Sequence, residues 1–247
     1  MPRDCTGDGG GRTARVTAAV LGIVLAQAAP ALAECGHDGV QITAPVERHD
    51  AICGALDDVL GYFRGIGFAF DPQVSIEMAE TVTITLVDAD GASVERTVMG
   101  VFEPSLGTIR VTDPGADPTR MRAPWGIAWN EDLALSVLRH ELTHMAVHAV
   151  LGPEACKLGC AWHEFIAYAV QFDLMPPGLR DEVERSHPGP EGFERLTEVN
   201  PFSLFIDPDQ FAVKAWRSAT SLGGGPFIAR LLRGESGIPT GEILWTK

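Results

Sequence analysis

The chain has 247 residues and a formal net charge of −14, with 33 acidic against 19 basic side chains. This excess of negative charge excludes a protein built to bind nucleic acid or an anionic membrane surface, because both would repel it. The length is enough for a domain with a substantial hydrophobic core.

The first segment predicts export. Arginines at positions 3, 12 and 15 precede the apolar run Val16 to Ala29, and Ala31 and Ala33 supply small residues before a cleavage site. These are the parts of a secretory signal peptide, and the run is too short for a membrane anchor. We therefore expect a signal peptide at 1–33 and cleavage near Ala33. The mature chain, 34–247, should form a single domain in the periplasm or the medium.

The mature chain would keep four cysteines, namely Cys35, Cys53, Cys156 and Cys160. An even number in an oxidising compartment favours disulfides, and nearness along the chain favours Cys35 with Cys53 and Cys156 with Cys160. Metal coordination by the thiolates of Cys156 and Cys160 is the alternative, which export disfavours. Lipidation of Cys35 is also disfavoured, because the preceding residue, Glu34, is not small.

Periodicity predicts a helix followed by a small, mostly antiparallel sheet. Apolar residues recur at helical spacing within 50–63, at Ile52, Leu56, Leu60 and Phe63. Three segments then predict strands joined by turns, because of alternation or bounding turn residues: 81–88, 94–104 and 107–113. The proline-rich stretch 113–124 predicts a loop.

The second half of the chain predicts helices. One should begin after Asn130, which is a good N-cap followed by two acidic residues, and end at the glycine and proline of 152–153. The next should cover 162–170, and two more 207–222 and 226–235. The triple glycine between the last two indicates a helix break, because it lacks the lysine and hydroxyl residue of a phosphate-binding loop.

The helix after Asn130 carries the motif HELTH at 140–144. His140 and His144 lie one turn apart on one face, about 6 Å along the axis, so both imidazoles can reach one metal ion. Zinc held by two imidazoles and one further protein ligand keeps a position for water and lowers the pKa of that water. Glu141 can then take the proton as a general base. The alternative is a chance match on an ordinary amphipathic helix.

Three residues compete to be the third ligand. His148 lies on the same face, but about 12 Å along an unbroken helix from His140, too far for ligands about 2 Å from one ion. Glu164 and its neighbour His163 lie on the next helix and cannot both face the metal. We expect Glu164, because the twenty residues after His144 let the chain turn back and set its carboxylate beside the imidazoles.

HELTH, followed nineteen residues later by the glutamate of WHEFIAY, resembles the HExxH-x19-E pattern of gluzincin, or thermolysin-like, zinc metallopeptidases. The segment around Glu164 is also similar to the W-x-E-G-x-A-x-Y segment of smaller peptidase MA-like proteins. The resemblance covers roughly 81–175 well. It implies an α+β, zincin-like fold in which the sheet precedes the motif helix, a second ligand-bearing helix and C-terminal helices. It also implies zinc on His140, His144 and Glu164, with Glu141 as the general base.

Two positions depart from the family. The aspartate that orients a histidine four residues after the ligand glutamate is Tyr168, and the glycine directly after it is Phe165. An oxyanion donor is also not assigned, and the candidates are Tyr62, Tyr168 and His187.

Three functions therefore compete. The first is an exported zinc-dependent peptidase that hydrolyses a peptide or protein substrate. The second is a catalytically inactive peptidase-like scaffold that binds a metal or a partner. The third is a metal-free exported domain with a chance motif.

Overall fold

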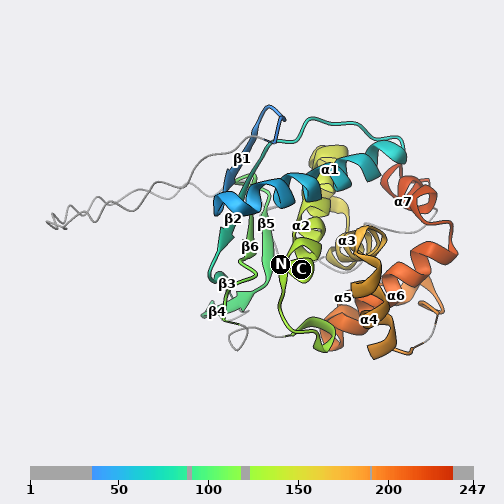
Figure 1. Cartoon of the computed structure of the whole chain (residues 1–247). Coiled ribbons are helices and arrows are strands. Elements are labelled where there is room, and N and C mark those ends of the chain that lie inside the picture. The colour runs from blue at the N-terminus through green and yellow to red at the C-terminus, as the bar shows by residue number, and fades with distance from the viewer. Residues whose placement is uncertain (1–34, 88–90, 118–122, 190, 236–247) are drawn as a thin grey trace, which may run out of the picture.

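The computed structural model of the chain describes residues 35–87, 91–117, 123–189 and 191–235 (Figure 1). The predicted signal peptide and its cleavage site lie outside these residues. The architecture is α+β, with a small sheet on one side and helices filling the other (Figure 1). Within the described ranges, no helix combines the length and the apolar composition that crossing a membrane requires.

The main sheet has four strands, in the order β1 (Val40–Thr43), β2 (Val74–Ala79), β6 (Thr108–Thr112) and β5 (Gly100–Glu103). The first three are parallel, and β5 runs antiparallel to β6 at the edge. The prediction of a mostly antiparallel sheet is therefore wrong for this sheet. The sequence analysis missed β1 and β2, which are joined by a helical crossover, and such a connection makes two strands parallel.

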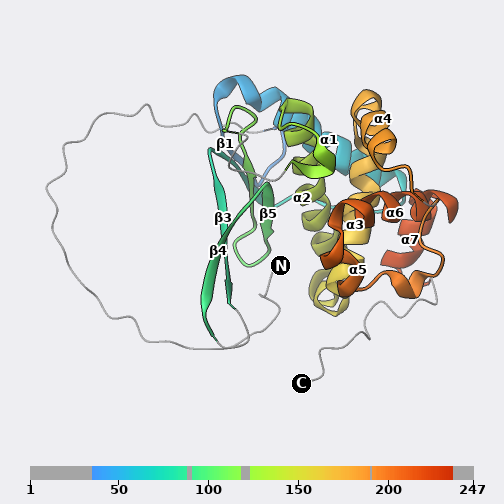
Figure 2. The same cartoon turned by 90° about the horizontal axis from the view of Figure 1, so that it is seen from below.

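The strands β3 (Val82–Val87) and β4 (Ser93–Val98) form a separate antiparallel ribbon. Figure 2 shows this ribbon on the side of the sheet away from the helices. β3 and β6 confirm the strands predicted at 81–88 and 107–113. The single strand predicted at 94–104 is instead two strands, because the chain changes its pairing partner at Met99, from β3 to β6.

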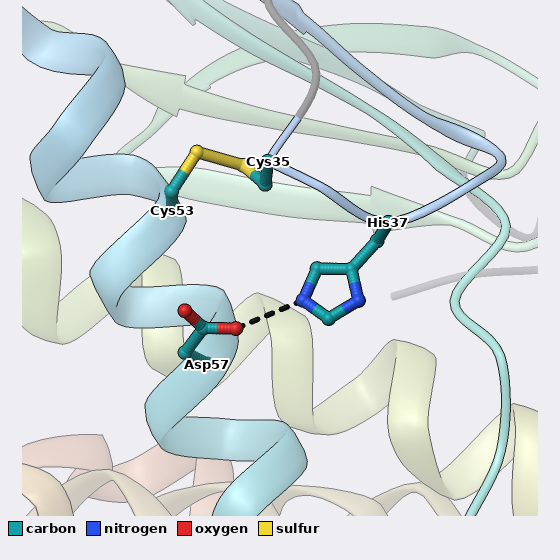
Figure 3. Close-up of a disulfide and its surroundings, with 4 residues drawn as sticks. All are labelled: Cys35, His37, Cys53 and Asp57. Carbon is teal, nitrogen blue, oxygen red and sulfur yellow. Dashed lines mark hydrogen bonds and ion pairs between the residues drawn. A yellow bond between two sulfur atoms is a disulfide. The ribbon is translucent and has the colours of Figure 1, made fainter.

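Helix α1 (His49–Gly65) confirms the helix predicted at 50–63 and makes the crossover from β1 to β2. The predicted disulfide between Cys35 and Cys53 is present, with Cα atoms 5.2 Å apart (Figure 3). It ties the segment before β1 to α1. One turn further along α1, Asp57 Oδ1 lies 2.8 Å from His37 Nε2, so the same two segments are joined a second time (Figure 3).

The predicted bridge between Cys156 and Cys160 is wrong, because the thiol of Cys160 is free. Cys156 belongs to the 3₁₀ turn Gly152–Lys157, whereas Cys160 is the first residue of α3 (Cys160–Leu174). Nearness in sequence does not aim two Cβ atoms at each other, and a disulfide needs both the distance and the direction.

Helix α2 (Glu131–Leu151) carries the HELTH motif and begins and ends as predicted. Asn130 Oδ1 accepts a hydrogen bond from the Leu133 N–H at 2.9 Å, and Gly152 ends the helix with a φ of 54°. The helix packs against α1, α3, β5 and β6, which places it at the centre of the molecule (Figure 1). Arg139 Nε and Nη2 bind Asp58 Oδ2 of α1 at 3.0 and 2.7 Å.

The remaining helices complete the side of the molecule opposite the sheet. Three confirm predicted helices, namely α3, α6 (Pro208–Ser221) and α7 (Gly225–Leu232). Two were not predicted, α4 (Pro177–Ser186) and α5 (Pro201–Ile206). α4 begins at Pro177, and a proline at the first helical position lacks only an N–H that would be unpaired anyway. Short 3₁₀ turns occur at Val46–Arg48, Pro124–Gly126, Gly152–Lys157 and Leu196–Glu198.

Candidate metal centre

Helices α2 and α3 bring three metal-ligating side chains together. His140 and His144 lie one turn apart on α2, and Glu164 comes from the second turn of α3. One ligand atom from each of the three residues can be chosen so that all lie within 4.8 Å of one another. The structure therefore places the three predicted ligands in one cluster, which could hold a metal ion.

The nitrogen and oxygen atoms lie close enough to share one ion. His140 Nε2 lies 3.1 Å from His144 Nε2 and 3.2 Å from Glu164 Oε2, and His144 Nε2 lies 3.5 Å from Glu164 Oε1. Ligand atoms about 2 Å from a tetrahedral ion are about 3.3 Å from each other. Two imidazoles and a carboxylate form a donor set that zinc accepts. The spacing and the donor set of the cluster could therefore hold a metal ion.

The protonation states of two ligands already suit metal binding. Burial lowers the pKa of His144 to about 3, so this imidazole is neutral above acidic pH. Burial opposes ionisation of Glu164, but the charges of His144 and His140 and the hydrogen bond from His140 outweigh it and lower the pKa of Glu164 to about 2. Metal ligands must be deprotonated. Both residues are therefore in the required form at neutral pH.

His140 is the ligand at which a proton and a metal would compete. Burial favours its neutral form, yet its hydrogen bond to Glu164 and the charges of Glu164 and Glu141 outweigh burial and raise the pKa of His140. In the metal-free protein the two carboxylates therefore favour a positive charge at this imidazole. A bound metal ion would supply the same charge.

Glu141 is buried between α2 and the edge strand β5. The backbone N–H of Phe102 donates a hydrogen bond to its carboxylate. A Cβ atom added at Gly100 would lie 2.8 Å from Val137 Cγ1 and 2.9 Å from both Cγ and Oε1 of Glu141, so the strand can approach this closely only because residue 100 is glycine. β5 therefore fixes the position of this carboxylate.

The pKa of Glu141 is raised to about 7, chiefly by burial and also by the charge of Glu164. A carboxylate that ionises near neutral pH is suited to general base catalysis there, because it gains a proton readily without being protonated most of the time.

The raised pKa of Glu141 predicts a pH-dependent stability effect in the metal-free protein. Between pH 4.5 and about 7 the folded state holds a proton that the unfolded state releases, so ionisation destabilises the fold as the pH rises through this range. Glu141→Gln removes that cost. We expect the variant to exceed the wild type in free energy of unfolding by about 2 to 3 kcal/mol at pH 8, and by much less at pH 4.

Urea unfolding of both proteins in the presence of a chelator measures this difference, and all other titrating groups are common to the two. An equal difference at pH 4 and pH 8 would contradict the raised pKa.

The two rejected histidines lie beside the cluster and outside it. His163 Nε2 donates to the backbone carbonyl of Ala155 at 2.8 Å. Its ring stacks on that of His148, with 5.4 Å between centroids, and His148 also meets the ring of Phe102 at 5.5 Å. Because these contacts occupy the two rings, the structure assigns neither residue to the ligand set.

The three candidate oxyanion donors are dispersed. Tyr62 donates to Asp173 Oδ2 at 3.3 Å, and burial and the charge of this carboxylate raise the pKa of Tyr62. His187, in the segment after α4, has its Nδ1 3.0 Å from Ser186 Oγ. Tyr168 is the one of the three that reaches the cluster, since its ring centroid lies 4.5 Å from that of His140.

The sequence analysis missed one residue that contacts a ligand. Gln171, on α3, places Oε1 3.1 Å from Nδ1 of His140. It follows Glu164 by seven residues, which is two helical turns, and therefore lies on the same face of α3. A lone amide between Val170 and Phe172 in an apolar helix, two turns from a proposed ligand, is the sequence signal that could have revealed it.

Among known proteins, the chain matches one family, whose function is unknown. A family model described as "Family of unknown function (DUF6639)" matches residues 40–238, which include the whole sheet and both helices of the metal cluster. No curated protein matches the chain, and no solved structure matches it.

Proposed function

Since this chain belongs to DUF6639, a family of unknown function, its activity has to be inferred from the site, and we propose that it is an exported zinc-dependent peptidase. The observation that carries the proposal is the meeting of His140, His144 and Glu164, with one ligand atom of each within 4.8 Å of the others and a buried carboxylate next to the first ligand. The gluzincin pattern HExxH-x19-E predicts the same three ligands and the same base.

Zinc in this cluster would act as a Lewis acid that lowers the pKa of a water molecule toward neutrality and polarises a substrate carbonyl. Glu141 would accept the proton of that water and transfer it to the leaving amine. Its carboxylate is held in place for this role by a hydrogen bond from the Phe102 N–H. His140, His144 and Glu164 would hold the ion.

Two observations support export. The disulfide between Cys35 and Cys53 is of the kind that forms and persists in oxidising compartments. The first 33 residues have the composition of a secretory signal peptide, and the net negative charge favours solubility.

The experiment that tests the proposal combines metal content with turnover. The purified mature protein should contain one zinc ion per chain and should cleave members of a broad peptide library in a reaction that a chelator stops and zinc restores. Absence of stoichiometric zinc would remove the basis of the proposal and favour a chance motif.

A catalytically inactive metal-binding or partner-binding scaffold is the second candidate. It is favoured by the dispersal of the oxyanion donors, because Tyr62 and His187 make their hydrogen bonds elsewhere. Stoichiometric zinc without cleavage of any library peptide would support the scaffold over the peptidase.

The close approach of β5 to the base gives a separate prediction. Gly100→Ala would force a methyl group against Glu141 and Val137, so the carboxylate must move. We expect kcat to fall by about 10-fold to 100-fold, since small displacements of catalytic groups have effects of this size, while the zinc content stays at one per chain.

Gly61→Ala is the matched control for this variant, because a Cβ at Gly61 of α1 would meet no atom within 4 Å. Unchanged kcat in Gly100→Ala would show that Glu141 does not depend on the strand.

A further inference from the structure

Two polar side chains are buried directly behind His140. Ser136 is fully buried on α2, one turn before His140, and Gln171 of α3 is only 1% exposed. They are bonded to each other and to the imidazole: Gln171 Nε2 donates to Ser136 Oγ at 3.0 Å, and Gln171 Oε1 lies 3.1 Å from His140 Nδ1. A continuous chain of hydrogen bonds therefore leads from α2 through α3 to the first ligand.

In the structure the amide of Gln171 presents its acceptor end to the histidine. A side-chain amide has a donor end and an acceptor end, and it can present either of them to an imidazole. With the NH2 group of Gln171 bound to Ser136 Oγ, the carbonyl oxygen is left for His140. An acceptor at that position requires a hydrogen on Nδ1. In the neutral imidazole, Nε2 must then carry a lone pair.

That lone pair lies on the side of the ring where the other ligands are. Nε2 of His140 is 3.1 Å from His144 Nε2 and 3.2 Å from Glu164 Oε2. The ring of Tyr168 also contacts that of His140, with 4.5 Å between centroids. Tyr168 stands at the position at which thermolysin-like enzymes have the aspartate that orients a histidine.

We propose that Ser136 and Gln171 are a positioning pair that fixes His140 as the Nδ1–H tautomer and so presents its Nε2 to the metal. The inference rests on the proposed zinc centre and not on peptide hydrolysis. Groups that bond to the outer nitrogen of a ligand histidine fix its orientation and raise its basicity. Here an amide does so, and a buried hydroxyl on the ligand helix accepts a hydrogen bond from the NH2 group of that amide.

The first test is the zinc affinity of the full mature protein, measured by competition with a chromophoric chelator. Gln171→Leu should weaken zinc binding by about 10-fold to 100-fold. Gln171→Glu should keep the affinity at or above the wild-type value, because a carboxylate oxygen still accepts the Nδ1–H bond. Ser136→Ala should have a smaller effect in the same direction. In this variant the amide of Gln171 loses the hydrogen bond to Ser136 but can still accept one from His140.

Gln210→Leu is the control, because Gln210 is half-buried on α6 and is not part of the cluster. Should Gln171→Leu fail to fold, the affinities of Ser136→Ala and Gln171→Glu still decide the matter. Wild-type affinity in both Gln171→Leu and Ser136→Ala would overturn the proposal, and so would a large loss in Gln171→Glu.

The second test is the tautomer itself, observed by proton–nitrogen NMR of the zinc-loaded protein labelled with ¹⁵N-histidine. The His140 ring should show a hydrogen on Nδ1 that exchanges slowly with solvent and a metal-bound Nε2, and the slow exchange should be lost in Ser136→Ala. Metal bound through Nδ1 would overturn the assignment.

The outcomes separate this inference from the proposed activity. If zinc binds through Nε2 but the protein cleaves no peptide, the positioning role of Ser136 and Gln171 stands and the proposed peptidase activity is wrong. If the wild type binds no zinc, both proposals are wrong.

Discussion

Glu141→Gln is expected to lower kcat for peptide hydrolysis by about 10² to 10⁴ while the protein keeps one zinc ion per chain. Glutamine has nearly the same shape and can still accept the hydrogen bond from the Phe102 N–H, but it cannot take up a proton. The expected loss is the range that a positioned general base contributes. Steady-state kinetics on a cleaved library peptide, beside metal analysis of the same sample, measures both quantities.

Glu182→Gln is the matched control for this experiment, because Glu182 is exposed on α4. It makes the same chemical change far from any proposed role and should leave kcat unaltered. Wild-type turnover in Glu141→Gln would mean that another group takes the proton, and the mechanism proposed for this site would then be wrong even with zinc present.

Glu164→Ala is expected to weaken zinc binding by more than about 100-fold. Loss of a group that only supports a ligand costs about 10-fold to 100-fold in metal affinity, and this variant removes a ligand itself. It also removes the carboxylate whose oxygens lie 3.2 Å from His140 Nε2 and 3.5 Å from His144 Nε2. Competition with a chelator measures the affinity, and atomic absorption measures the metal retained after gel filtration.

The same variant should change how zinc affects stability. A metal that binds only the folded state at about 1,000 times its Kd adds about 4 kcal/mol to the free energy of unfolding. The wild type should show this gain when zinc is added, whereas Glu164→Ala should show little of it. Glu154→Ala, at an exposed position between α2 and α3, should behave as the wild type. Equal zinc stabilisation in all three proteins would exclude Glu164 as a ligand.

The ligand cluster was predictable because its chemistry is local. A helix of 3.6 residues per turn places positions 140 and 144 on one face whatever the surrounding fold is. The same geometry separates His148 from them. Glu164 required one further step, a helix that returns beside the first, and the glycine and proline that end α2 make that return possible.

The sheet was predicted less well because pairing is not local. β1 has only four residues, too few for alternation to be distinguished from chance. β2 does alternate, with Val74, Ile76 and Met78 separated by Ser75 and Glu77, so this strand was within reach of the sequence and was overlooked. Without these two strands, the observed parallel order could not be inferred from the antiparallel pairing that the predicted strands 81–88 and 94–104 suggest. Gln171 was missed for a related reason, since its role depends on which side chains α2 presents to it.

Of the two predicted disulfides, one is confirmed and one is wrong. Cys35 and Cys53 are joined because α1 packs beside the segment that leads into β1. The pair that is closer in sequence, Cys156 and Cys160, is not joined, since the thiol of Cys160 is free. The number of residues between two cysteines did not predict which of them lie side by side in the fold.

The bridge between Cys35 and Cys53 has a consequence for the order in which the chain assembles. Parallel strands form late in folding, because a long loop must close before their hydrogen bonds stabilise it. β1 and β2 are such a pair, with all of α1 between them. Once the bridge has formed, the segment leading into β1 is already fastened to α1, and the unfolded chain has fewer arrangements to search. Formation of this disulfide would thus hold the segment before β1 against α1 before β2 pairs with β1. A chain made under reducing conditions would lack this constraint.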